Sequence, residues 1–473
     1  PDQRTVGWQL PDDDTVLAGT DIPTGDAPEA FAFVEHPTIW GLSDSDQSSH
    51  GFVRTELPNG IVVLAQPRPD DSAVDCTISI EAGQAATSEQ LAGLPSMTAK
   101  MLNRGTTKHT FDQFNETIDT LGAVIGVDAD RDTIDVSFHS LAEDLDAVLD
   151  LAAEIIREPT FPADELDRVR QQTITGLREQ ESDTGAQASR LLREQMYPEG
   201  HPYRLRVSGE IETVERFSPD DLMAYHRRAF GPNVTTVALV GGVESIDAIT
   251  SRLHRVFGDW TSPVPEPRVV PAIEASDARS TRTAVVRGKS QADIAIAYPT
   301  LARSLDTPYV ALSIANIILG QLGLMGRLGA NVRDKQGLAY YAYSSIAGGL
   351  ANSVWTARAG VDPANIQRAI DGITSEMIRL RSEPVSDEEL ADAKSYVIGS
   401  LPLGLESLGG VVSLLLTIER FGYPLNYVDI FPSLIENLTV GDLLDSSQRF
   451  LNPDRLTIGI AGPESIEAGA NGS

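Results

Sequence analysis

Residues 220–242 read DDLMAYHRRAFGPNVTTVALVGG, and residues 441–463 read GDLLDSSQRFLNPDRLTIGIAGP. In both segments a capped helix is followed by an apolar strand. Four pairs of positions match at one constant separation of 221 residues: Leu222 with Leu443, Pro232 with Pro453, Val237 with Ile458, and Gly241 with Gly462. A second echo joins EPTFPADEL (158–166) to EPVSDEEL (383–390). The chain therefore contains two copies of one fold, each of roughly 200 residues, which is a usual domain size.

The repeat divides the 473 residues into five parts. We expect an N-terminal arm or linker at 1–50, a first domain at 51–261, a Pro-rich linker at 262–280, a second domain at 281–466 and a tail at 467–473.

Strand and helix signals occur in mixed order within the first copy. FVRTELPNGIVVLAQP (52–67) predicts a hairpin around Pro-Asn-Gly, and amphipathic helices are predicted at 89–103, 111–121, 143–157 and 163–181. Because strands and helices do not alternate strictly, we expect an α+β fold. Each of its two homologous domains should be a mostly antiparallel sheet with helices packed on one face.

Composition excludes several classes of protein. The net charge is −31, from 37 basic and 68 acidic residues, which argues against nucleic acid as a partner. No apolar run is long enough for membrane insertion, and the single cysteine, Cys76, excludes an intrachain disulfide. The chain begins at Pro1, so we expect that an upstream part was cleaved or left out. We expect a soluble protein of the bacterial cytoplasm or periplasm and leave the compartment open.

A glycine-rich stretch near the start of the second copy carries the most distinctive chemistry. Residues 317–345 read IILGQLGLMGRLGANVRDKQGLAYYAYSS, an apolar helical run followed by spaced glycines and a Tyr-rich strand. The guanidinium of Arg333 and the phenol of Tyr340 could together hold a carbonyl oxygen or a carboxylate. The alternative is a core strand preceded by a loose loop.

Two parts of the sequence resemble a known family. The stretch from LPNGIVVLAQ (57–66) to DTIDVSFHS (132–140) resembles the first domain of the pitrilysin/insulinase superfamily of zinc metallopeptidases, the inverzincins. The type most resembled is the bacterial processing peptidase. Residues 317–345 resemble the glycine-rich and Arg/Tyr region of that family's second domain, so the resemblance covers about 51–466.

The family's catalytic members carry an inverted zinc motif, H-x-x-E-H, on the helix before a Gly-Thr turn. That motif supplies two metal ligands and a general base. Aligned on Gly93-Leu94 and Gly105-Thr106, the two histidine positions hold Ser96 and Lys100, and the base position holds Ala99.

The third ligand in the family is a glutamate on a later helix. The corresponding segment here offers Gly176 and Leu177, with Glu179 the nearest carboxylate. No two histidines are spaced to rebuild a site, and His109 is expected to be an ordinary surface or capping residue. We therefore expect no metal on this chain and no peptide hydrolysis by this chain alone.

The other half of the family's active site is retained. The resemblance implies that Tyr340 stabilises the oxyanion of the scissile carbonyl and that Arg333 positions the peptide. Tyr341 and Tyr343 lie close in sequence, but only Tyr340 has the family's register. Similar non-catalytic subunits use a glycine-rich loop to take in substrate, which would give Gly320, Gly323, Gly326 and Gly329 a role in substrate binding. The alternative is a flexible connector.

Two hypotheses follow. The first is a non-catalytic, substrate-binding subunit of a heterodimeric zinc metalloendopeptidase, whose zinc belongs to an H-x-x-E-H-bearing partner subunit or to an upstream half of the same precursor. The second is a catalytically inert scaffold or core-type protein on the same fold. A homodimer that binds peptides without cutting them is a third possibility.

Overall fold

A computed structural model describes residues 48–261 and 270–466. Most of the expected arm at 1–50, part of the expected linker at 262–280 and the tail at 467–473 lie outside the described residues. The domain boundaries stay predictions for this reason.

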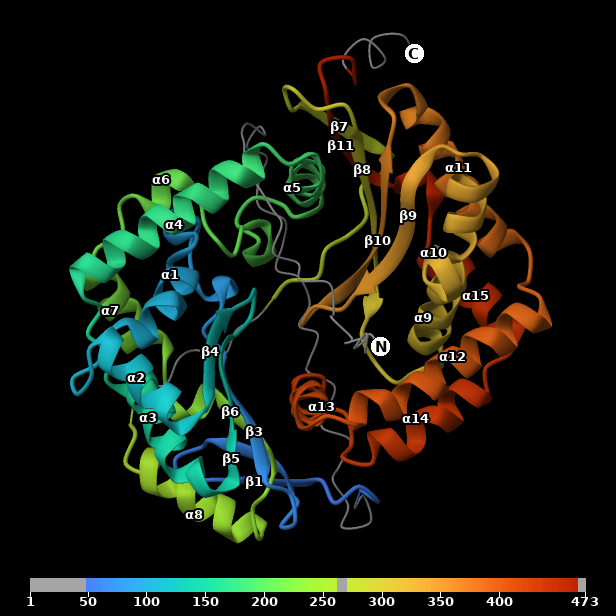
Figure 1. Cartoon of the computed structure of the whole chain (residues 1–473). Helices are drawn as coiled ribbons and strands as arrows, with labels where there is room; N and C mark the ends of the chain where they lie inside the picture. Colours follow the sequence, from blue (N-terminus) through green and yellow to red (C-terminus); the bar gives the residue numbers. More distant parts are fainter. Residues whose placement is uncertain (1–47, 262–269, 467–473) are drawn as a thin grey trace, which may run out of the picture.

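The first half of the chain forms one sheet with its helices (Figure 1). Its elements are β1 (Val53–Glu56), β2 (Val62–Pro67), β3 (Ala73–Ile80), η1 (Gln84–Ala86), η2 (Glu89–Leu91), α1 (Leu94–Met101), η3 (Leu102–Arg104), α2 (Phe111–Leu121), β4 (Val124–Ala129), β5 (Ile134–Leu141), η4 (Ala142–Asp144), α3 (Leu145–Arg157), α4 (Ala163–Glu181), α5 (Thr184–Met196), η5 (Pro202–Arg204), α6 (Ile211–Val214), α7 (Pro219–Ala229), η6 (Pro232–Val234), β6 (Thr235–Gly241) and α8 (Ile246–Phe257).

The second half repeats this plan with its own sheet. Its elements are β7 (Ser280–Val285), β8 (Ala292–Ala302), α9 (Thr307–Gly320), α10 (Leu322–Leu328), the π-helix η7 (Gly329–Lys335), β9 (Ala339–Ala347), β10 (Asn352–Val361), η8 (Pro363–Asn365), α11 (Ile366–Ser382), α12 (Asp387–Leu405), α13 (Leu408–Arg420), α14 (Tyr427–Glu436), α15 (Val440–Phe450), η9 (Pro453–Arg455) and β11 (Thr457–Gly462).

Among the described residues, the first sheet has six strands in the order β1-β2-β6-β3-β5-β4, and the second has five in the order β7-β11-β8-β10-β9. All neighbours are antiparallel except β2 with β6 and β7 with β11, which are parallel. The last strand of each copy therefore lies inside its sheet beside an early strand. The predicted α+β class with two homologous, mostly antiparallel sheets is confirmed.

Local sequence signals explain the best-predicted elements. The structure begins and ends α2 and α4 at the predicted residues. Thr110 and Gln113 form a capping box at the start of α2, and Gly122, with φ of 59°, ends it in the left-handed region. Phe114 and Ile118, four residues apart, bury one face of α2 in the first core.

The two halves exchange one helix each. Helix α5, which belongs to the first half by sequence, packs on β7, β8 and β11, whereas α13 of the second half packs on β2, β3 and β6. Val411, Leu415 and Ile418 of α13 are buried against Leu64 and Val240 of the first sheet. The expectation of helices on one face of each sheet is therefore incomplete, because the opposite face is partly covered from the other half.

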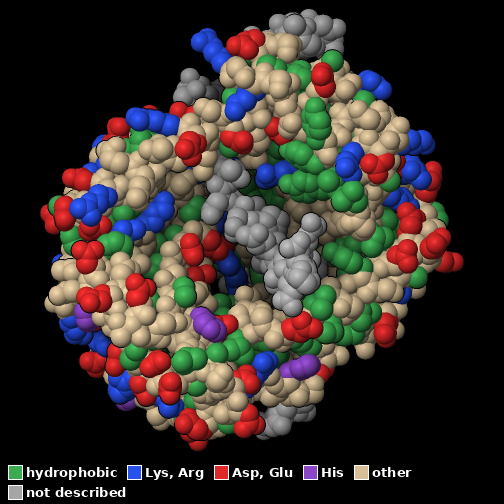
Figure 2. All heavy atoms as spheres, viewed as in Figure 1, with side chains coloured by type: hydrophobic (Ala, Val, Ile, Leu, Met, Phe, Trp, Pro, Cys, Tyr) green, Lys and Arg blue, Asp and Glu red, His purple; other side chains and the backbone are tan. Residues whose placement is uncertain are grey.

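The described surface is polar and unevenly shaped. On the face in Figure 2 the surface is hollowed between the two halves, and hydrophobic side chains gather on the wall that the second half forms. In the parts of the chain that the structure describes, no single helix is long and apolar enough to cross a membrane. Two helix pairs would pass by length and composition together, but they bend by 90° and 113°.

Candidate functional site

Helix α1 carries Ser96, Ala99 and Lys100, the residues predicted to match the family's zinc motif, and it is almost wholly buried. It packs against α4, α7 and β4, and Ser96 and Ala99 are 7% and 1% exposed. Lys100 is exposed, and its Nζ donates a hydrogen bond to Thr173 Oγ1 of α4 at 3.2 Å. A hydroxyl, a methyl group and an ammonium therefore occupy the matching positions.

These residues do not fit a zinc ion. Structural and catalytic zinc sites use thiolate, imidazole or carboxylate ligands, and a nearby ammonium opposes a cation electrostatically. In residues 48–261 and 270–466 there is no group of three or more His, Cys, Asp or Glu side chains that could hold a metal ion. No chemistry that needs a metal is therefore assigned to this chain.

The position facing Lys100 differs from the sequence expectation. Leu177 is 1% exposed in the core, and Glu179 lines an open, polar pocket of about 440 Å³ with Arg178, Asp183 and Lys289. Thr173, one helical turn before Leu177, is the residue that contacts Lys100. Sequence alignment missed Thr173, although the four-residue spacing from Leu177 places it on the same face of α4.

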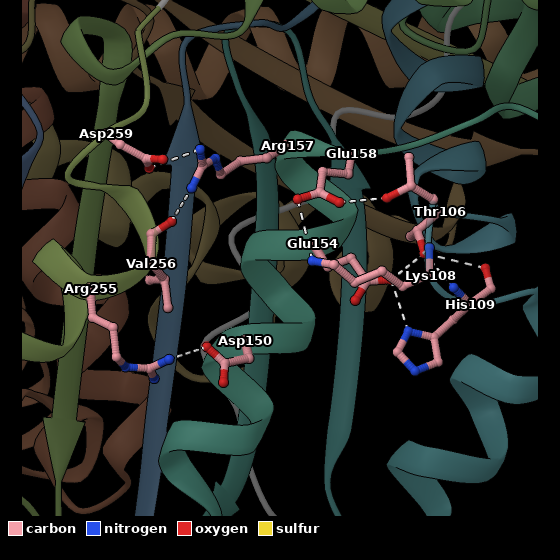
Figure 3. A network of polar contacts seen from close by, with 11 residues as sticks. Thr106, Lys108, His109, Asp150, Glu154, Arg157, Glu158, Arg255, Val256 and Asp259 are labelled. Atoms are coloured by element: carbon pink, nitrogen blue, oxygen red, sulfur yellow. Dashed lines mark hydrogen bonds and ion pairs between the residues drawn. The ribbon is translucent and has the colours of Figure 1, made fainter.

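His109 has a partner in the buried carboxylate of Glu154. Its Nδ1 lies 2.8 Å from Glu154 Oε1 of α3, and Glu154 also accepts a hydrogen bond from Thr106 Oγ1 (Figure 3). Nearby, Lys108 Nζ donates to Glu158 at 3.3 Å. Because Glu154 is buried, these contacts satisfy its carboxylate and fix the turn after η3 to α3.

The glycine-rich stretch is folded rather than loose. After α9, residues 323–326 leave helical geometry inside α10, and η7 follows directly. A Cβ on Gly320 would lie 2.2 Å from Ser344 N, and one on Gly326, which has φ of 56°, would lie 2.5 Å from Ile318 O. These two glycines therefore permit close packing of backbone on backbone, so a flexible connector does not describe the stretch.

An ion pair and a hydrogen bond hold this stretch against helices α12 and α11 of the same half. Arg327 donates two hydrogen bonds of 2.7 Å to the carboxylate of Glu389 at the start of α12. The Arg327 guanidinium lowers the pKa of Glu389 to about 2. In η7, Asn331 Nδ2 donates to Glu376 Oε1 of α11 at 2.5 Å. The backbone around Arg333 is thus fixed from two helices.

Arg333 lies in the π-helix η7, just before the turn into β9. Its carbonyl accepts a hydrogen bond from Gly337 N at 3.0 Å, which closes that turn. Its side chain is 35% exposed, and Nη1 lies 3.6 Å from Asp334 Oδ1. A partly exposed pair of this kind contributes little stability, so the guanidinium can exchange this contact for a ligand at low cost.

Tyr340 lies at an irregularity in the edge strand β9. Gly360 of β10 pairs with Tyr341 and Val361 pairs with Ala339, so Tyr340 is the additional residue of a β-bulge. Tyr340 is 71% exposed, and no other described residue hydrogen-bonds to its hydroxyl. The helix η7 packs against β9, which brings Arg333 and Tyr340 into the same part of the fold.

Comparisons with known proteins identify the family of this chain. The family model described as "Insulinase (Peptidase family M16)" matches residues 62–204, and that described as "Peptidase M16 inactive domain" matches residues 216–397. A Streptomyces coelicolor protein named an uncharacterised zinc protease is 24% identical over 368 residues, 76% of this chain and 78% of that protein. A Helicobacter pylori protein named a non-peptidase homolog is 23% identical over 388 residues, 81% of this chain and 87% of that protein.

Solved structures show the same fold. The peptidase M16 inactive domain from Pseudomonas fluorescens superposes with a TM-score of 0.81 and 25% identity, over 87% of this chain and 98% of that chain. The Escherichia coli periplasmic protease PqqL superposes with a TM-score of 0.75 at 14% identity, and the match covers 95% of this chain but 48% of that chain.

The fold defines a two-domain, peptidase-like protein whose described residues hold no group of side chains that could bind a metal ion. The chain belongs to the insulinase family of peptidases, family M16, as a non-catalytic member. Its relatives carry the names of both zinc proteases and non-peptidases.

Proposed function

We propose that this chain is the substrate-binding subunit of a heterodimeric zinc endopeptidase. A second polypeptide with an intact H-x-x-E-H motif would hydrolyse the peptide, and this chain would supply Arg333 and Tyr340 to the same site. The single observation that carries the proposal is the exposed Tyr340 on a β-bulge of β9, the strand against which the Arg333-bearing η7 packs, while residues 48–261 and 270–466 hold no group that could bind a metal ion.

The chemistry of the two side chains suits this role. The Tyr340 hydroxyl donates a hydrogen bond to the carbonyl oxygen of the scissile bond as negative charge develops there. The guanidinium of Arg333 has several donors for carbonyl groups of the bound peptide. Because the packed segment 320–335 fixes the backbone of Arg333, little ordering is needed when the substrate arrives.

The four glycines of this stretch have different roles in the proposal. Gly320, Gly326 and Gly329 permit backbone packing, whereas a Cβ on Gly323 would meet nothing within 4 Å. Leu324 beside Gly323 is 64% exposed. We assign substrate contact to the surface at Gly323 and Leu324, and structural roles to the other three glycines.

The second part of the proposal concerns which polypeptide carries the catalytic half. A separate partner chain is our first choice. The 48% coverage of the PqqL chain leaves room for another unit of this size in that protein. An upstream half of the same precursor is therefore kept as the alternative arrangement.

The test uses the complex reconstituted with its H-x-x-E-H partner. Tyr340→Phe removes only the hydroxyl and should lower turnover on the order of 100- to 1,000-fold, as loss of one oxyanion donor does. Arg333→Ala should also lower turnover sharply. Tyr343→Phe is the matched control on the same strand and should leave turnover within a few-fold.

Size-exclusion chromatography should show the same heterodimer for all three variants. Unchanged turnover in Tyr340→Phe, in a complex that is active and dimeric, would contradict the proposal. That result would favour the inert scaffold, on which nothing requires the Tyr340 hydroxyl.

A further inference from the structure

Asp293, near the start of β8, joins three elements through one buried carboxylate. It is 6% exposed, and it accepts hydrogen bonds from the Tyr341 hydroxyl of β9 and from Thr184 Oγ1 at the start of α5. Gln291 Nε2 lies 3.4 Å from Asp293 Oδ1 as an additional donor. A buried carboxylate needs such donors, so the contacts to Tyr341 and Thr184 are strongly favoured.

Tyr341 is held in place by packing as well as by this hydrogen bond. A Cβ on Gly360 would lie 2.5 Å from Tyr341 Cε1, so the ring lies against the bare backbone of β10. Burial and the bond to Asp293 raise the pKa of Tyr341, so its hydroxyl stays a proton donor. The pair of Tyr341 with Gly360 is the last regular pair before the bulge at Tyr340.

The first half contains an equivalent carboxylate, which supplies a natural comparison. Asp75 of β3 lies at the start of the exchanged helix α13, where a Cβ on Gly409 would be 3.4 Å from Asp75 Oδ2. In the second half, a Cβ on Gly185 of α5 would be 3.9 Å from Asp293 Cγ. Both carboxylates are favoured by the helix dipole. Asp75 bonds to His139 on β5 at 2.6 Å, whereas Asp293 bonds to the edge strand that carries Tyr340.

We propose that Asp293 and Tyr341 are positioning residues that hold the β-bulge of β9 and so set the direction of Tyr340. Through Thr184 the same carboxylate connects β9 to α5 of the first half. The role of Tyr340 in peptide cleavage rests on the proposed function, whereas the inferred geometry of β9 does not.

Strand β9 packs on α9, α10 and η7, but it is an edge strand and loses its regular pairing at the bulge. Beyond Tyr341 toward the N-terminal end of β9, Tyr340 is exposed and outside the ladder. Tyr341 therefore ties this end of the strand to β8, while Leu338, just before β9, is buried in the second core. Releasing its hydroxyl should let the bulge open or shift, which would misdirect the Tyr340 phenol even though no atom of Tyr340 changes.

The first experiment measures amide hydrogen exchange of residues 337–343 in the full-length chain. Tyr341→Phe keeps the ring and removes the hydroxyl, and Asp293→Asn removes the charge. Each should speed exchange in this segment about ten-fold, because one hydrogen bond to a charged group is lost. Asp75→Asn, which breaks the equivalent contact of the first half, should leave exchange at 337–343 unchanged.

Unchanged exchange at 337–343 in Tyr341→Phe would overturn the inference. Equal acceleration in Asp75→Asn would also overturn it, because the effect would then be a general loosening of the two halves. The double variant Tyr341→Phe/Asp293→Asn should be no faster than the faster single variant, since Tyr341→Phe removes the same bond that Asp293→Asn weakens.

The second experiment measures peptide turnover in the reconstituted complex. Tyr341→Phe and Asp293→Asn should lower kcat about ten-fold and leave KM nearly unchanged, because misdirection of an oxyanion donor acts mainly in the transition state. A large loss in Tyr340→Phe with no loss in these two variants would overturn the positioning role alone. No loss in Tyr340→Phe would overturn the proposed function, and faster exchange in Tyr341→Phe would still support the geometry.

Discussion

The ammonium of Lys100 in the first half and the phenol of Tyr340 in the second half show how single residues set the chemistry that each half can offer. Lys100 donates to Thr173 at a position predicted to match one of the family's zinc-binding histidines, and an ammonium there would oppose a cation. Tyr340 keeps an exposed hydroxyl, although an aromatic ring that is 71% exposed contributes little to folding. Because folding does not require the exposed ring, contact with a ligand is the better explanation for a tyrosine at position 340.

Asp135 gives a pH-dependent prediction at the same scale. Burial raises the pKa of this carboxyl on β5 to about 6, with Ser79 Oγ donating to it at 2.6 Å. Because the folded-state pKa lies above the ordinary value of 3.8, the neutral form is favoured in the fold. Its contribution to the free energy of unfolding is present below about pH 4 and is lost as pH rises through about 6.

Urea unfolding of the wild type and of Asp135→Asn between pH 4 and 7 measures this contribution. Relative to the variant, the wild type should lose stability as pH rises across that window, because only the wild type must ionise a buried group. A constant difference between the two proteins at all pH values would contradict the assignment.

At the scale of elements, the segment from α9 to β9 works as one packed unit. Gly320 lies directly against Ser344 of β9, and Arg327 fastens α10 to the start of α12. Arg333 and Tyr340 are therefore presented by a rigid element rather than by a loop, which favours precise placement of both side chains.

Gly320→Ala tests this packing. Its Cβ would meet Ser344 N and Oγ at 2.2 Å, so we expect destabilisation of about 1–3 kcal/mol by overpacking. Gly399→Ala on the exposed side of α12 is the matched control, because a Cβ there meets nothing within 4 Å. That change should be neutral or stabilising by up to ~1 kcal/mol, as expected from helix propensity. Equal unfolding midpoints for the two variants would contradict this prediction and would show that β9 shifts to accommodate the added methyl group.

The elements that the sequence predicted are those with strong local signals. Helix α2 has a capping box and a C-terminal glycine, and the repeat of 220–242 at 441–463 indicated two copies of one fold. Helix α5, the bulge at Tyr340 and the contact of Thr173 with Lys100 were not predicted. The bulge and the Lys100 contact each depend on a partner more than 15 residues away, and such contacts leave no pattern in the local sequence. Helix α5 has a local signal in its N-cap Asp183 and its buried Ala188, Leu192 and Met196, but its place on the sheet of the other half has none.

At the scale of the whole molecule, the exchange of α5 and α13 ties the two halves together. Each sheet is complete only when the helix of the other half covers part of its second face. Further contacts cross the same boundary, because Arg420 of α13 bonds to Asp132, which also accepts a hydrogen bond from Tyr203 at 2.8 Å. The two copies should therefore behave as one cooperative unit.

Calorimetry provides the check. We expect one unfolding transition, with a calorimetric enthalpy close to the van't Hoff enthalpy, because neither half can lose its exchanged helix without exposing the other half's core. Two resolved transitions of comparable enthalpy would show that the halves unfold independently and that the exchanged helices contribute little.

The central claim is that this chain completes a peptide-cleaving site whose metal belongs to another polypeptide. The most direct measurement is hydrolysis of an unfolded peptide by the H-x-x-E-H partner alone, by this chain alone and by the two mixed at equal concentration. We predict little activity for either chain alone and substantial activity for the mixture. If the partner alone is as active as the mixture, or if the chains form a heterodimer that remains inactive, the claim is wrong.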